Sequence, residues 1–87
     1  MSVKERITNA LATLAPSQLE ILDESERHHG HAGWKEGGET HFRVRIVSPA
    51  FAGKTRLERH RMVNALVADE FRGRLHAFAL DAKAPGE

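Results

Sequence analysis

The chain of 87 residues contains no cysteine. This absence excludes disulfide bonds, a nucleophilic thiol, cysteine-ligated zinc sites and any iron–sulfur cluster held by this chain's own thiolates. Histidine and carboxylate side chains are then the only strong metal ligands that the chain can supply. A reducing compartment is compatible with this composition.

A long hydrophobic run is also missing. Residues 1–14 carry charges at Lys4, Glu5 and Arg6, and their apolar residues form no run long enough for a signal or membrane segment. We therefore expect a soluble, cytoplasmic protein with no membrane partner. A hydrophobic fraction of 40%, with no internal repeat or low-complexity segment, predicts a single globular domain over residues 1–87 with a small core.

Motifs for nucleotide binding or catalysis are absent as well. The triplet "GKT", which begins at Gly53, precedes a predicted helix, but a phosphate-binding loop also needs a glycine five residues earlier, where Ser48 stands. No Ser/His/Asp set is indicated by local spacing, and so short a chain has little room for a walled substrate pocket. We expect neither an enzyme nor a small-molecule substrate.

Two capping boxes mark the beginnings of two predicted helices. Ser2 with Glu5 opens the first, which Pro16 ends. Thr55 with Glu58 opens the second, which runs to about residue 71. The apolar residues expected on the core faces of these helices are Val3, Ile7, Ala10, Leu11, Leu14, Val63, Leu66, Val67 and Phe71.

Alternating apolar and polar residues predict three strands, at about residues 18–25, at "THFRVRIVS" (40–48) and at "LHAFALDA" (75–82). The second strand is the clearest, and its expected core face holds Phe42, Val44 and Ile46. The fold class is therefore α+β, in the order helix, strand, strand, helix, strand. A three-stranded sheet of this kind needs both helices on one face to bury its apolar side.

Charge is divided unevenly along the chain. The whole chain has a net charge of +1, but residues 43–61 hold six basic residues and one acidic residue, Glu58, which leaves +5 there and −4 elsewhere. Such a block can attract nucleic acid or an acidic partner surface, although most short charge runs are solvated faces. The basic residues are Arg43, Arg45, Lys54, Arg56, Arg59 and Arg61.

Four of the six histidines lie in "RHHGHAGWKEGGETH", residues 27–41. His28 and His31 are three residues apart, so both could reach one metal ion on a helical turn, and exposed loop histidines also bind zinc, nickel or copper adventitiously. His76 shares a strand face with Phe78 and Leu80. That spacing alone favours a core histidine bonded to a backbone carbonyl.

The strand entry "ETHF", the "F-x-G" turn, the helix segment "RHRMV" and the final strand "HA-x-A-L", together with "DESERH" at residues 23–28, resemble the BolA family over nearly the whole chain. The resemblance implies a class II KH-like (BolA-like) fold with a mixed three-stranded sheet backed by helices. It also implies a heterodimer with a monothiol glutaredoxin that shares a 2Fe-2S cluster. The resemblance implies a second activity as well, because some members of the family are DNA-binding transcriptional regulators of cell shape and stress responses.

The resemblance assigns candidate ligands to this chain. His76 matches the family's C-terminal ligand, which reverses the preference for a core histidine. The family's second ligand comes from the loop between the first two strands: alignment from "DES" selects His28 and alignment from "ETHF" selects His31. The pattern "H-x-G-H-A-G" favours His31, with His28 as the alternative. Thiolates would come from the glutaredoxin and glutathione, so the isolated chain is expected to carry no cofactor.

A second expectation is duplex DNA binding through the basic helix, Lys54 to Arg61. None of the basic residues has a spacing that indicates base readout, and no GXXG loop of the kind that KH domains use adjoins this helix. The same charges would suit an acidic glutaredoxin surface. The residues expected to contact phosphate are Lys54, Arg56, Arg59 and Arg61, with Arg43 and Arg45 extending the patch.

Overall fold

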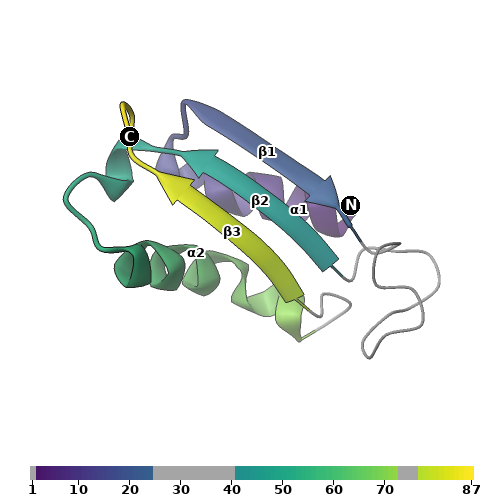
Figure 1. Ribbon diagram of the computed structural model, residues 1–87. Helices are drawn as coiled ribbons and strands as arrows, with labels where there is room; N and C mark the ends of the chain where they lie inside the picture. The colour runs from purple at the N-terminus through teal and green to yellow at the C-terminus, as the bar shows by residue number, and fades with distance from the viewer. Residues whose placement is uncertain (1, 25–40, 73–76) are drawn as a thin grey trace.

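The computed structural model describes residues 2–24, 41–72 and 77–87. These residues form a three-stranded sheet with two helices on one of its faces (Figure 1). The predicted α+β class and element order are confirmed, and none of the described helices is long and apolar enough to cross a membrane. The elements are α1 (Val3–Leu11), a 3-10 helix (Ala12–Leu14), β1 (Gln18–Asp23), β2 (His41–Val47), a second 3-10 helix (Pro49–Phe51), α2 (Arg56–Phe71) and β3 (Ala77–Lys83).

The sheet is mixed, with β2 in its centre. β1 pairs with β2 in antiparallel register, so that Ile21 lies opposite Val44. β3 pairs with β2 in parallel register, so that Leu80 lies opposite Val44 on the other side. Parallel neighbours need a crossover connection, and α2 provides it. β1 ends at Asp23 and β3 continues to Lys83, so the first strand is shorter and the third extends one residue further than predicted; residues 25, 75 and 76 lie outside the described ranges.

The hydrophobic core lies between the sheet and the two helices. The predicted alternation of β2 is confirmed, because Phe42, Val44 and Ile46 are all nearly inaccessible to solvent. Of the helix residues expected in the core, Ala10, Leu14 and Leu66 are only partly buried, and the side chain of Phe71 lies outside the described set. Within the described ranges, the buried apolar residues are Val3, Ile7, Leu11, Ile21, Phe42, Val44, Ile46, Phe51, Val63, Val67 and Ala84.

Both predicted capping boxes are present. The Ser2 hydroxyl accepts the Glu5 N–H at 3.1 Å while the Glu5 carboxylate accepts the Ser2 N–H at 3.3 Å. Thr55 and Glu58 repeat the arrangement at 3.1 and 2.8 Å. Because these hydrogen bonds favour the ionised form, they hold the pKa of both glutamates below the ordinary value.

Ser48 is a fully buried polar residue that joins the two layers where β2 ends. Its hydroxyl donates to the carbonyl of Leu14 at 2.5 Å and accepts the N–H of Ala50 at 3.1 Å. Its backbone N–H donates to the carbonyl of Lys83 at 2.9 Å. One residue therefore connects the end of the first helical segment, the second 3-10 helix and β3.

Replacing Ser48 with alanine should lower the free energy of unfolding by about 1–3 kcal/mol, because the part-buried backbone groups of Leu14 and Ala50 lose their partner. Urea denaturation followed by circular dichroism measures the change. Ser17→Ala is the matched control, since Ser17 is exposed and its hydroxyl makes only a 3.3 Å bond to Val47; a change within about 0.5 kcal/mol is expected there. Equal losses in the two variants would contradict the role assigned to Ser48.

Candidate functional site

The metal ligands expected from the sequence, His76, His31 and His28, lie outside the described residues and stay predictions. Within residues 2–24, 41–72 and 77–87, no group of three or more histidine or acidic side chains is arranged to hold a metal ion. The described part of the chain thus offers no complete metal site. A metal group on this protein would need ligands from elsewhere in the chain or from a partner.

The described chain next to these histidines converges on one end of the sheet (Figure 1). Glu24, which immediately follows β1, donates its backbone N–H to the carbonyl of His41 at 2.8 Å. Ala77, the residue that follows His76 in the sequence, pairs with His41 across β2 and β3. Glu24 and His41, which flank the histidine-rich connector, and Ala77, which follows His76, therefore lie at the same end of the sheet.

This sheet end also carries a half-buried ion pair. Arg43 Nε lies 3.2 Å from Glu24 Oε2, and the Glu24 side chain is only 14% exposed. His41 is buried, with 7% of its surface exposed. This burial is typical of a residue with a structural role at a strand entry.

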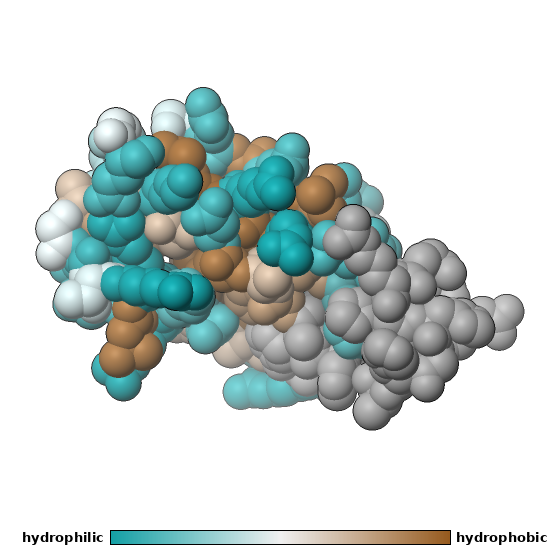
Figure 2. Space-filling view, in the orientation of Figure 1, coloured by the Kyte–Doolittle hydropathy of each residue, from teal (hydrophilic) through white to brown (hydrophobic). Residues whose placement is uncertain are grey.

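The six basic residues expected to contact phosphate divide between two regions. Arg43 and Arg45 alternate with the core residues of β2 and so project from the open face of the sheet. Figure 2 shows hydrophilic side chains spread over this face, with apolar residues between them. Arg45 Nη1 forms an ion pair with Glu20 at 3.1 Å across β1 and β2. The other four residues, Lys54, Arg56, Arg59 and Arg61, lie immediately before α2 or in its first turns.

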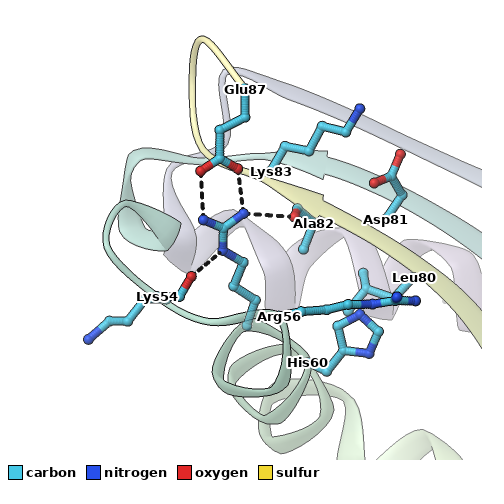
Figure 3. A pocket seen from close by; sticks show the side chains of 9 residues that line it. Lys54, Arg56, His60, Leu80, Asp81, Ala82, Lys83 and Glu87 are labelled. Atoms are coloured by element: carbon cyan, nitrogen blue, oxygen red, sulfur yellow. Dashed lines mark hydrogen bonds and ion pairs between the residues drawn. The ribbon is translucent and has the colours of Figure 1, made fainter.

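An open groove of about 540 Å³ separates the N-terminal end of α2 from β3 (Figure 3). Four of its lining residues are basic and two are acidic, which gives a net charge of +2 with His60 neutral. The Arg56 and His60 side chains lie together beside Leu80, whereas the Lys54 ammonium group points outward (Figure 3). The lining residues are Lys54, Arg56, Arg59, His60, Leu80, Asp81, Ala82, Lys83 and Glu87.

Arg59 and Glu87 form a two-point ion pair in this groove. Arg59 Nη1 lies 2.5 Å from Glu87 Oε1 and Nη2 lies 2.7 Å from Oε2. The same guanidinium donates to the carbonyls of Ala82 at 3.2 Å and Lys54 at 3.0 Å. Its side chain is only 12% exposed. Arg59 therefore binds a carboxylate and two backbone groups of its own chain, which sequence reasoning had not anticipated.

A tight turn returns Glu87 to Arg59. The Glu87 N–H donates to the carbonyl of Ala84 at 3.2 Å, and Glu87 Oε1 accepts the Ala84 N–H at 3.0 Å. Pro85 followed by Gly86 with φ +87° is typical of a type II turn. The hydrogen bonds from Arg59, and then that from Ala84, lower the pKa of Glu87 to about 2.

Three comparisons with known proteins agree that this chain is similar to BolA-like proteins. The family model described as "BolA-like protein" matches residues 11–87. SufE-like protein 1, chloroplastic/mitochondrial, of Arabidopsis thaliana is 42% identical over 91 residues, covering 100% of this chain and 24% of that protein. Human BolA-like protein 1 is 46% identical over 74 residues, covering 85% of this chain and 51% of that protein. The solved structure of BolA1 from Arabidopsis thaliana matches with a TM-score of 0.87 at 36% identity, covering 100% of this chain and 96% of the other. The chain spans about half of the length of human BolA-like protein 1 and about a quarter of the length of SufE-like protein 1.

Glu87→Gln should destabilise the fold at neutral pH and progressively less in acid. The folded-state pKa of about 2 lies below the ordinary value of 4.5, so the ionised carboxylate stabilises the folded state above about pH 4.5. That stabilisation is lost as the pH falls from about 4.5 towards 2. Urea denaturation of both proteins at neutral pH and at steps down to the lowest pH at which the fold persists measures the difference.

The control is Asp69→Asn, which removes a carboxylate from the Asp69–Arg72 pair, whose side chains are 86% and 81% exposed. A smaller loss at neutral pH is expected there, because solvent screens exposed pairs. A difference between wild type and Glu87→Gln that stayed constant from neutral pH into acid would contradict the assignment.

Proposed function

The chain belongs to the BolA-like protein family, and we propose that it is a non-enzymatic adaptor that forms a heterodimer with a monothiol glutaredoxin and shares a histidine-ligated 2Fe-2S cluster with it. Such an adaptor would serve iron–sulfur trafficking or iron and redox sensing. One observation carries the proposal: the described chain flanking His76 and the histidine-rich connector meets at one sheet end, around the His41–Ala77 pair.

The composition of the chain supports a shared site. With no cysteine, the chain would supply imidazole from His76 and from His31, or from His28 as the alternative, and the glutaredoxin and glutathione would supply the thiolates. A bound cluster provides electron-transfer chemistry, and neutral imidazole in place of a charged thiolate raises its reduction potential. The isolated chain would then carry no cluster. Glutathione thiols persist in reducing compartments, so the cytoplasm is the proposed location.

The relatives give the proposal a second support. All of this chain matches about a quarter of a protein named SufE-like protein 1, and this match supports an iron–sulfur role for a domain of this kind. Because this chain covers only that part of the relative, the activity of the whole relative is not carried over.

Anaerobic reconstitution with a monothiol glutaredoxin and glutathione tests the cluster proposal. The wild-type mixture should give a visible circular dichroism spectrum distinct from that of the glutaredoxin alone, and His76→Ala should abolish the distinction by removing one ligand. Parallel His31→Ala and His28→Ala variants identify the second ligand, since only the true ligand should alter the spectrum.

His60→Ala is the matched control, because His60 lies in α2 beside the groove at the far end of β3. It should leave the spectrum unchanged. A wild-type spectrum retained by His76→Ala would rule out that residue as a ligand.

The second candidate function is DNA-binding transcriptional regulation of morphology and stress responses. Its support is the exposure of Lys54, Arg56 and Arg61 around the beginning of α2. Arg43, Arg45 and Arg59 already form ion pairs within the chain, which reduces the charge available for phosphate.

Duplex binding through the three exposed residues should show a slope of log affinity against log salt of about −3, rather than the about −5 expected from all six basic residues. Fluorescence anisotropy over a salt series measures the slope, and Arg56→Gln should make it shallower by about one. Arg72→Gln serves as the control, since Arg72 lies at the opposite end of α2. Undetectable binding even at low salt, or binding without any sequence preference, would argue against a regulator.

A further inference from the structure

The groove between α2 and β3 already contains a bound carboxylate, that of Glu87. The Arg59 guanidinium donates hydrogen bonds to both of its oxygens, at 2.5 and 2.7 Å, and the Ala84 N–H donates a third at 3.0 Å. Paired N–H donors from one guanidinium match the two oxygens of a carboxylate in distance and direction. The Glu87 side chain therefore shows that this groove can bind a carboxylate.

An exposed apolar residue adjoins the groove. Leu57, in the first turn of α2, is 59% exposed, the larger value of the two exposed large hydrophobic residues in the described chain. Together with Arg56 and His60 it lines a second, smaller hollow of about 390 Å³. Arg56 and His60 line both hollows, so the apolar residue and the carboxylate-binding residue belong to one continuous surface.

We propose that this surface docks an acidic segment of a protein partner and that Glu87 is its intramolecular competitor. A partner carboxylate replaces Glu87 on Arg59, and a neighbouring apolar side chain of the partner packs against Leu57. The inference goes beyond the proposed function, because it requires neither a cluster nor any of the predicted histidine ligands.

The lining favours an acidic protein segment over a nucleic acid. The net charge of the groove is only +2, and Asp81 within it would repel a continuous phosphate backbone. An exposed leucine beside arginine is typical of a protein docking site, in which an apolar anchor is surrounded by polar contacts. With its pKa lowered to about 2, Glu87 is ionised at physiological pH and competes there with a partner carboxylate for Arg59.

The competitor depends on the turn at Gly86. Its φ of +87° is strained for any residue with a Cβ, yet a Cβ built there meets no atom within 4 Å. Gly86→Ala therefore disfavours the turn that returns Glu87 to Arg59 without a steric clash and without removing the charge. This separates displacement of Glu87 from simple loss of a negative charge.

Fluorescence anisotropy of the full chain with a labelled acidic peptide tests the proposal. The probe is about ten residues long, with glutamates on both sides of one central leucine. Glu87→Gln and Gly86→Ala should each tighten binding by about two- to fivefold, the range expected for freeing one partner of a surface ion pair. Arg56→Gln and Leu57→Ser should weaken it. Thermal melts by circular dichroism confirm that each variant is folded at the assay temperature.

The matched control is Arg72→Gln, which removes the same charge from the other end of α2, where Arg72 is 81% exposed, and should change affinity less than Arg56→Gln. Unchanged or weaker binding by Glu87→Gln would overturn the competitor role, and so would tightening in that variant without tightening in Gly86→Ala. Equal affinity for a peptide without leucine would overturn the role of Leu57. Tighter binding of a DNA duplex than of the peptide at the same salt concentration would overturn the choice of an acidic protein partner.

Discussion

Val44, at the middle of β2, lies among Ile7 and Leu11 of α1 and Val63 and Val67 of α2. This burial holds both helices to the same face of the sheet and fixes the register of β2. A shift by one residue would turn Arg43 and Arg45 into the core and expose the apolar face. Because β1 and β3 both pair with β2, the faces of all three strands follow from this packing.

Because β3 pairs in parallel with β2, the two candidate sites lie at opposite ends of β3. At the N-terminal end of β3, Ala77 pairs with His41, next to the sequence positions proposed to hold a cluster. At its C-terminal end, Ala82 and Lys83 line the groove at the beginning of α2, where Arg59 holds Glu87. A partner could therefore contact the groove without occupying the cluster end, which makes docking and ligand supply separable in this fold.

Local sequence signals predicted much of the fold. The two capping boxes depend on residues three positions apart, and the alternation in β2 depends on neighbours, so both could be inferred without tertiary contacts. Strand ends were less accurate, because pairing partners rather than propensity decide where a strand stops. The mixed character of the sheet came from the resemblance to the BolA family, since periodicity alone does not give strand direction.

The candidate site was harder to predict. Arg59 looked like one member of a basic run, yet it binds Glu87, 28 residues away, and no local pattern joins the two. The Pro-Gly turn before Glu87 was the one available signal, and it indicates only a reversal of the chain. The choice between His31 and His28 depends on how a connector is aligned, which composition and spacing do not determine.

In the proposed heterodimer, this chain supplies imidazole to a cluster whose thiolates come from a partner. Pulsed electron paramagnetic resonance of the reduced heterodimer tests it directly, with nitrogen-15 histidine incorporated only into this chain and an unlabelled glutaredoxin. A nitrogen-15 hyperfine coupling to the cluster is the expected result. A spectrum with no such coupling, from a heterodimer that still contains the cluster, would contradict it.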